Sequence, residues 1–199
     1  MRQVSHEVEM GRQGQKSRTR DAILAAAREL AAAGQALSVP AVAEAAGVSR
    51  ATAYRYFSDP SVLAAEAGLD VAVAPYEQIV AGAEGPRARL MAVSLYMFDL
   101  AAGHEAAFRH FLARWLDAWA AGSGPTRGAR RVEMFKRALG EDRAGLSAAD
   151  AAALVRGLTA TTGTEALIGL LDVAEADRAA ARATVEEITG LLIARYLGT

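Results

Sequence analysis

The amino-acid sequence predicts an all-α protein. Alanine occurs almost throughout its 199 residues, whereas proline occurs only 5 times. Alternation of β-branched and polar residues, the pattern of a half-buried strand, is nearly absent, so helix is the expected state of most of the chain. Hydrophobic residues make up 52% of the sequence, which is enough for one sizeable core or for a small domain joined to a medium one.

The first segment, residues 1–17, is rich in Gln, Ser, Gly and charged residues and is expected to form a flexible basic arm. Arg12, Lys16, Arg18 and Arg20 follow one another with no acidic residue between them. Such a stretch is either a solvated arm or an arm that follows a phosphate backbone, and both interpretations carry equal weight. The net charge of the whole chain is −1, so any affinity for nucleic acid must be local.

The first helix is expected from residue 18 to residue 33. Ile23, Leu24, Ala27 and Leu30 form its apolar stripe, because residues three and four apart share one face of a helix. Gly34 follows directly and is the residue type that commonly ends a helix.

Two short helices are expected next, at residues 39–46 and 50–57, joined by a turn around Gly47. Ser38 and Ser49 precede these helices and can cap them, and Gly47 can adopt the left-handed conformation that a sharp turn requires. A fourth helix is expected to start at Pro60, with Asp59 as its cap, and Pro75 is expected to end or kink it.

The second short helix is predicted to have two distinct faces. Successive residues advance by 100°, which places Ala53, Tyr56 and Phe57 together on an apolar face. The opposite face carries side chains that can bond to base edges or phosphates, with Thr52 at its margin. Its members are Arg50, Ala51, Tyr54 and Arg55. An amphipathic helical hairpin can also be part of a core, so the spacing alone leaves both interpretations open.

The identities of individual residues in this segment indicate more than the amphipathic pattern does. The run Ala-Val-Ala-Glu-Ala-Ala-Gly-Val-Ser at 41–49, followed by Thr52-x-Tyr54-x-Tyr56-Phe57, resembles the signature of the TetR (tetracycline-repressor) family of transcriptional regulators. The resemblance covers residues 18–66, where the first helix also agrees at Arg20, Ile23, Ala26, Ala27 and Gly34. It implies a three-helix helix-turn-helix DNA-binding domain at residues 18–66 and a helical effector-binding and dimerisation domain at residues 67–199.

The resemblance also implies roles for single residues. Arg50 and Thr52 match positions that reach base edges or nearby phosphates, and Tyr54 and Tyr56 match aromatic residues that contact the DNA backbone. Tyr56 has an equally weighted alternative as a core residue. The expected DNA-binding residues are Arg18, Ser49, Arg50, Ala51, Thr52, Tyr54, Arg55 and Tyr56.

Two positions depart from the family pattern. Pro60, preceded by Asp59, stands where members usually have a phosphate-binding lysine, and Ala53 stands where leucine is common. The first departure puts the usual phosphate contact in doubt. The second requires other residues to supply the packing beneath the recognition helix.

Residues 67–199 are expected to be helical near 76–82, 86–102, 104–121, 126–139, 148–172 and 176–197. Apolar stripes occur in the last two of these helices, with Leu154, Leu158 and Ile168 in one and with Val185, Ile188, Leu192 and Tyr196 in the other. The resemblance implies a homodimer through these two helices that binds a palindromic double-stranded operator. The stripes alone fit a face turned toward the protein's own core equally well.

A ligand cavity is expected in this part of the chain. Aromatic residues at helical spacing are usually core, but polar groups are interleaved among them here, as in pockets that bind small, mainly apolar molecules. The expected ligand-binding residues are Tyr96, Phe108, Phe111, Trp115, Trp119, Thr162 and Glu165. The identity of the small-molecule effector cannot be read from the sequence.

Several classes of function are not expected. The chain has no cysteine, its three histidines form no HExxH arrangement, and it has no GxSxG elbow or phosphate-binding Gly-rich loop. We therefore expect no metal, no cofactor, no catalytic residues and no enzymatic activity. The absence of a signal peptide and of a long apolar run predicts a cytoplasmic protein with no membrane partner.

The function expected from these observations is a ligand-responsive, DNA-binding repressor that a small molecule releases from its operator. The alternative is a helical small-molecule binding protein, or an enzyme, without DNA binding.

Overall fold

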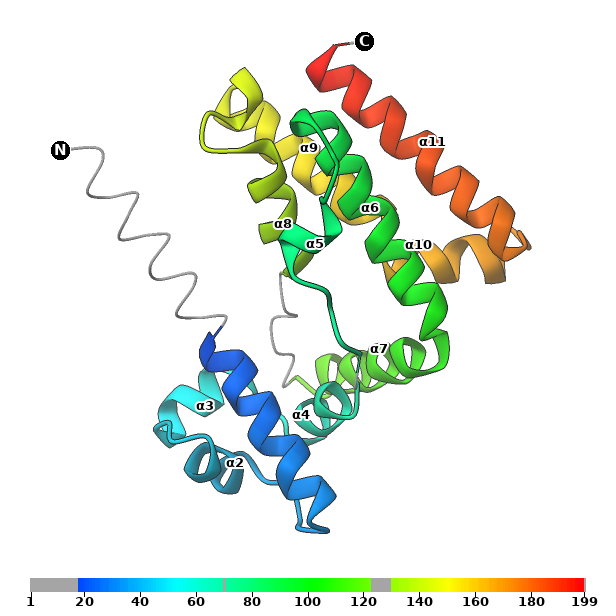
Figure 1. The fold of residues 1–199 in the computed structure, drawn as a ribbon. Helices are drawn as coiled ribbons and strands as arrows, with labels where there is room; N and C mark the ends of the chain where they lie inside the picture. Colours follow the sequence, from blue (N-terminus) through cyan, green and yellow to red (C-terminus); the bar gives the residue numbers. More distant parts are fainter. Residues whose placement is uncertain (1–17, 70, 123–129, 199) are drawn as a thin grey trace, which may run out of the picture. The chain divides into compact units, whose positions relative to one another are not determined.

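A computed structural model describes residues 18–69, 71–122 and 130–198, and these residues contain helices and no strands, as the sequence predicts. The first helix spans residues 18–32. The later elements, labelled in Figure 1, are α2 (Val39–Ala45), α3 (Arg50–Tyr56), α4 (Pro60–Ala67), α5 (Tyr76–Ile79), α6 (Gly85–Gly103), α7 (Glu105–Ala120), α8 (Arg130–Leu139), the 3-10 turn η1 (Arg143–Gly145), α9 (Ala148–Thr161), α10 (Thr164–Ile168), the π-helical turn η2 (Gly169–Val173) and α11 (Arg178–Leu197).

The described residues form two compact units. The first contains residues 18–69 and 109–122, and the second contains residues 71–108 and 130–198. The division falls inside α7, whereas the sequence analysis places all of that helix in the second domain. The expected boundary after residue 66 remains a prediction, because a compact unit is not by itself an independently folding domain.

The first unit has a core built from one face of each of its first four helices. Ile23, Leu24 and Ala27 are buried and Leu30 packs against them, which confirms the predicted stripe. Ala43 is fully buried in α2, where its methyl group lets neighbouring helices approach closely. The other buried members of this core are Ala26, Val39, Val42, Ala53, Phe57, Leu63 and Ala67.

The fourth helix is shorter than the sequence suggested. It ends at Ala67, and the N–H of Gly68 closes its last turn on the carbonyl of Ala64, so Pro75 neither ends nor kinks it. Glycine has a low helix propensity, which accounts for an end at this position without proline. Pro75 instead directly precedes the short helix α5.

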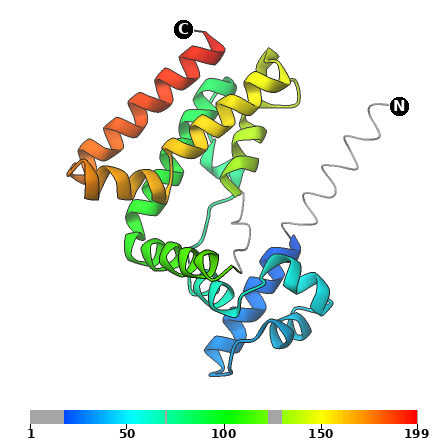
Figure 2. The ribbon, with the colours of Figure 1, turned by 180° about the vertical axis from the view of Figure 1, so that it is seen from behind.

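The second unit is organised around α6 and α11, which lie side by side in Figures 1 and 2. They are antiparallel: Arg182 near the start of α11 donates to Asp99 near the end of α6 at 2.9 Å, and Arg87 near the start of α6 donates to the carbonyl of Leu197 at 2.8 Å. Helix α8 packs on α6 and α9, and α9 also packs on α11.

Most residues of the two expected apolar stripes face the core of their own unit, whereas Ile168, which lies in α10, and Ile188 in α11 are only half-buried. Leu154, Leu158 and Val185 are fully buried, and Leu192 and Tyr196 pack against the buried residues. Of the two orientations left open by the sequence, these residues therefore adopt the one directed toward their own core.

The helix expected over residues 148–172 is broken. Thr162 is extended, Gly163 has φ 86°, and the chain then continues as α10 and η2. The hydroxyl groups of Thr161 and Thr162 donate to the carbonyls of Gly157 and Leu158, at 3.0 and 2.7 Å, and so satisfy acceptors at the end of α9. Helical periodicity continues across this break in the sequence, which is why the pattern alone predicted one helix.

None of the described helices combines the length and the hydropathy that a membrane span requires.

Candidate functional site

The turn between α2 and α3 is built from local interactions that the sequence predicted. The hydroxyl of Ser38 accepts the N–H of Ala41 at 3.3 Å and caps α2. Gly47 has φ 66°, and the N–H groups of Gly47 and Val48 bond to the carbonyls of Glu44 and Ala43 at the end of α2. These two bonds form the Schellman motif, in which glycine takes the left-handed position. The turn that sets the direction of α3 relative to α2 therefore depends on Gly47.

Ser49 caps α3 and also sets the hydrogen bonding of Thr52. Its Oγ accepts the backbone N–H of Thr52 at 3.1 Å and donates to Oγ1 of Thr52 at 2.8 Å. Because the Thr52 hydroxyl accepts a hydrogen bond from Ser49, its own O–H remains available to donate to a further acceptor. Phosphate oxygens and the N7 and O6 atoms of guanine are acceptors of this kind.

Helix α3 has the two faces that its sequence predicted. Ala53 and Phe57 are fully buried, whereas Arg50, Ala51 and Arg55 are exposed and Tyr54 retains 47% of its accessible surface. Thr52 lies at the margin and is half-buried. The exposed face therefore presents two guanidinium groups, a phenol and a hydroxyl on a helix whose other side is anchored in the core.

Tyr56 had two expected roles, as a core residue and as a contact with the DNA backbone, and the structure shows only its packing against the core. Its ring is half-buried and packs against the core of the first unit. The guanidinium of Arg55 lies 5.6 Å from the centroid of the same ring, within cation–π range. Tyr56 thus supports the orientation of Arg55, and its contact with DNA remains a prediction.

Arg18 and Arg20, the two residues of the basic stretch that the structure describes, lie in different environments. Arg18 is exposed, but Arg20 is turned into the first unit, where it pairs with Glu66 and lies 4.6 Å from the centroid of the Phe57 ring. Including Arg20 in a solvated or phosphate-following arm was therefore wrong. Arg12 and Lys16, like the rest of the predicted arm at 1–17, lie outside the described residues.

The start of α4 carries a carboxylate. Oδ1 of Asp59 accepts both the N–H and the hydroxyl of Ser61 at 2.7 Å, and Pro60 occupies the first turn. This is the cap that the sequence predicted. At the position of the usual lysine, the chain thus has a proline next to a negative charge.

The seven expected ligand-binding residues are divided between the two units. Four of them have an interaction inside the second unit: the hydroxyl of Tyr96 accepts the N–H of Ala74 at 2.6 Å, Phe108 packs against a buried cluster around Phe98, the hydroxyl of Thr162 donates to Leu158, and Glu165 pairs with Arg131. Phe111, Trp115 and Trp119 belong to the part of α7 that groups with the first unit. Trp119 retains 64% of its accessible surface, and its role as a ligand contact stays a prediction.

A hollow of about 330 Å³ does occur in the second unit, between α8, α9 and α10. Glu165 is the only one of the seven expected residues that lines it. The others in its lining are Arg131, Val132, Val155, Arg156, Thr159 and Ala160. Arg131 and Arg156 were not predicted from the sequence, because a single arginine on a helix carries no signal that separates a binding role from an ordinary exposed position.

No group of three or more metal-ligating side chains occurs in the part of the chain that the structure describes. Residues 23–67 match the family model described as "Bacterial regulatory proteins, tetR family", and this match includes α2, α3 and α4. Comparison of the chain with curated proteins and with solved structures gave no significant match.

Proposed function

We propose that this chain is a DNA-binding transcriptional regulator of the TetR type, and that it is a repressor that a small, mainly apolar molecule releases from its operator. The match of residues 23–67 to the tetR-family model supports the DNA-binding part of this proposal. The observation that carries this proposal is the exposed face of α3. A helical carrier or an enzyme has no need for a capped, firmly anchored helix that presents Arg50, Tyr54 and Arg55 to solvent.

Each exposed group on α3 has a distinct task in this proposal. The guanidinium of Arg50, in the first turn, can form two hydrogen bonds with one guanine in the major groove. Thr52 donates its hydroxyl proton to a base edge or a phosphate, and Ser49 keeps that proton available. Tyr54 and Arg55 contact the phosphate backbone, as does Arg18, while Ala51 leaves room for the approach of the groove wall.

The regulator acts as a homodimer through its last helices. Leu191 on α11 retains 64% of its accessible surface, so its apolar side chain is available for contact with a second copy of the chain. Two recognition helices related by a twofold axis require a palindromic operator with half-sites about one helical turn apart, ~34 Å.

The effector is bound by the helical part that follows the DNA-binding domain. The hollow in the second unit supports this proposal, since its volume of about 330 Å³ is at the lower end of the range for small-molecule sites, roughly 300–1,000 Å³. Glu165 lines this hollow. The ligand contacts expected at Tyr96, Phe108, Phe111, Trp115, Trp119 and Thr162 stay predictions from the sequence, because none of these residues lines it. The ligand can change the affinity for DNA only to the extent that it binds one arrangement of the two recognition helices, α3 of each copy, more tightly than another.

The test of DNA recognition is a fluorescence-anisotropy titration with the promoter region of the chain's own gene and with an unrelated duplex of equal length. Replacing Arg50 by alanine is expected to cost about 1–3 kcal/mol of discrimination between the two duplexes. Arg28→Ala is the matched control, because Arg28 is an exposed arginine on the first helix. Equal loss in both variants, or no preference for the promoter in the unmodified protein, would favour the carrier interpretation.

A further inference from the structure

The hollow between α8, α9 and α10 combines charged and apolar walls. Arg131 and Arg156 supply two positive charges and Glu165 supplies one negative charge, so the lining carries an excess of one cation. Val132, Val155 and Ala160 contribute apolar surface. A site of this composition suits a ligand with an anionic head and a short apolar body rather than an uncharged hydrocarbon.

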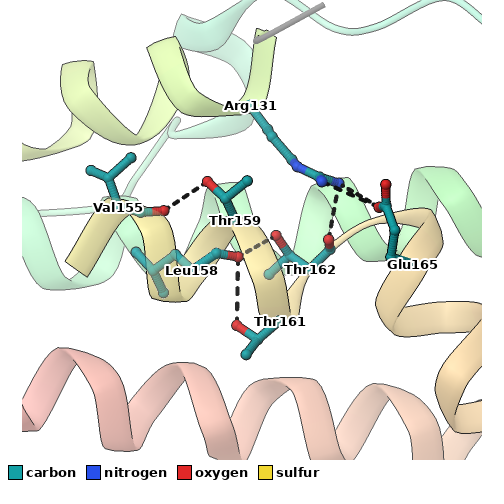
Figure 3. Close-up of polar contacts among 7 residues, drawn as sticks. All are labelled: Arg131, Val155, Leu158, Thr159, Thr161, Thr162 and Glu165. Carbon is teal, nitrogen blue, oxygen red and sulfur yellow. Dashed lines mark hydrogen bonds and ion pairs between the residues drawn. The ribbon is translucent and has the colours of Figure 1, made fainter. Parts of the chain in front are cut away.

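The guanidinium of Arg131 is held at the edge of this hollow by two different partners (Figure 3). Its Nη1 donates to the carbonyl of Thr162 at 3.0 Å, and both Nη1 and Nη2 donate to the same oxygen of Glu165, Oε2, at 3.2 Å. These bonds to Glu165 are at the long end of the normal range. A carboxylate that offered one oxygen to each nitrogen would form the stronger bidentate arrangement.

The chain leaves space for this guanidinium at the break between α9 and α10. Gly163 has φ 86°, and a Cβ atom built on it would overlap Nη1 of Arg131. The backbone carbonyl of Thr162 thus remains an anchor for Arg131 whichever carboxylate occupies the other side of the guanidinium. Arg131 can therefore exchange one acidic partner for another without losing its position.

We propose that this hollow binds a small organic carboxylate, whose head group replaces Glu165 on the guanidinium of Arg131. Arg156 supplies the second positive charge, and Val132 and Val155 contact the apolar body. Glu165 is an internal competitor for the ligand, and its side chain, 37% exposed, turns toward solvent when the ligand binds. The hollow thereby selects organic acids over neutral and cationic molecules of the same shape.

Binding of the carboxylate requires only the second unit's own residues, whereas its effect on transcription rests on the repressor function proposed above. Displacement of Glu165 removes its ion pair with Arg131, which is one contact between α8 and α10. The ligand therefore changes the contact between these two helices, and this change is the event by which an organic acid would act on DNA binding.

The experiment is isothermal titration calorimetry of the full chain with octanoate, with octan-1-ol and octylamine as neutral and cationic analogues and with acetate as the head group alone. We expect one octanoate to bind per chain. The affinities of the other three compounds should be at least about tenfold lower, because octan-1-ol and octylamine lack the carboxylate and acetate lacks the apolar chain. Glu165→Gln is expected to tighten octanoate binding about three- to tenfold, because the competing charge is removed. Glu187→Gln, which removes an exposed carboxylate of α11, is the matched control and should change the affinity by less than about twofold.

Loss of binding is tested at Arg156 rather than at Arg131, because Arg131→Gln would also remove the structural contact to Thr162. Arg156→Gln leaves the contacts of Arg131 in place and is expected to weaken octanoate binding about threefold or more. Lys136→Gln, the loss of one exposed cation on α8, should leave it unchanged. Equal binding of octanoate and octan-1-ol, or a Glu165→Gln variant that binds octanoate no more tightly, overturns the carboxylate site.

The same proteins are then titrated onto promoter DNA with and without octanoate. Binding of octanoate with the expected variant pattern but without an effect on DNA affinity supports the site and contradicts ligand control of repression. Conversely, a failure of promoter binding in the absence of any ligand contradicts the repressor function alone.

Discussion

Arg20 and Glu66 form an ion pair that joins the first helix to α4. Nε of Arg20 donates to Oε1 of Glu66 at 3.0 Å, Nη2 donates to Oε2, and the two side chains retain only 15% and 17% of their accessible surface. The same guanidinium lies over the ring of Phe57, directly after α3. The side chain of Arg20 thus connects the first helix to α4 and to Phe57, the residue that follows α3.

Removal of this pair is expected to destabilise the first unit. Glu66→Gln leaves the guanidinium of Arg20 half-buried without its charged partner, and we expect a loss of about 1–3 kcal/mol in the free energy of unfolding. Urea denaturation followed by circular dichroism measures this loss. In an Arg20→Met, Glu66→Gln double variant, part of the loss should be restored, and strictly additive effects of the two substitutions would show that the pair contributes no coupling.

Ser49 and Thr52 are expected to separate stability from DNA binding. Ser49→Ala removes the cap of α3 and should cost about 1 kcal/mol of unfolding free energy. Thr52→Val keeps the shape and the backbone N–H but removes the hydroxyl donor, so it should lower promoter affinity while reducing stability less. Thermal melts and anisotropy titrations of both variants check this, and an unchanged affinity of Thr52→Val contradicts the proposed donor.

Leu191 is expected to lie in the dimer interface. Leu191→Asp places a charge on the exposed face of α11, which should dissociate the dimer and weaken promoter binding without unfolding the chain. Sedimentation velocity measures the oligomeric state. Val173→Asp is the control, since Val173 is an exposed apolar residue outside α11, and dissociation by both or by neither variant argues against an interface at Leu191.

Gly163 is expected to be intolerant of a side chain for two separate reasons. Gly163→Ala forces alanine to a φ of 86° and a ψ of −160°, a region that essentially only glycine adopts, which costs about 1–3 kcal/mol, and also displaces the guanidinium of Arg131. In an Arg131→Ala background only the first cost remains, so the substitution should be less damaging there. Unfolding free energies of the four proteins test this, and equal effects of Gly163→Ala in both backgrounds would rule out the steric contribution of Arg131.

The stability of the second unit is expected to fall at alkaline pH because of Tyr76. Its hydroxyl is buried with no hydrogen-bond partner among the described residues, and burial raises the pKa of this phenol above its ordinary value of 10.0, against the opposing effect of Arg89 and Arg137. The folded protein therefore holds this proton more tightly than the unfolded chain does. The resulting stability is present below pH 10 and is lost as the pH rises through the folded pKa.

The test compares the unmodified protein with Tyr76→Phe between pH 8 and pH 11. The variant is expected to be at least as stable at pH 8, because phenylalanine buries no unpartnered hydroxyl, and its unfolding free energy should fall less steeply above pH 10. Tyr54→Phe serves as the control, since Tyr54 is exposed. Identical pH profiles of all three proteins would contradict the assignment.

The sequence by itself determined the helix-turn-helix. The capping hydroxyl of Ser38 reaches a backbone group three residues away, and so does that of Ser49. The glycine turn closes over at most five residues at Gly47 and Val48. The two faces of α3 follow from the helical repeat alone. Interactions of such short range leave a readable pattern, which is why the match to residues 23–67 and the local geometry agree.

The tertiary structure alone decided where the other side chains found partners. Arg20 pairs with a residue 46 positions away, and Arg131 bonds to groups 31 and 34 positions away, so no spacing in the sequence distinguishes these arginines from exposed ones. The apolar stripes at Leu154 and Val185 suited an interface and a core equally, because hydrophobic burial has no preferred direction or partner. That they face their own core follows only from the packing of α6, α8, α9 and α11 against one another.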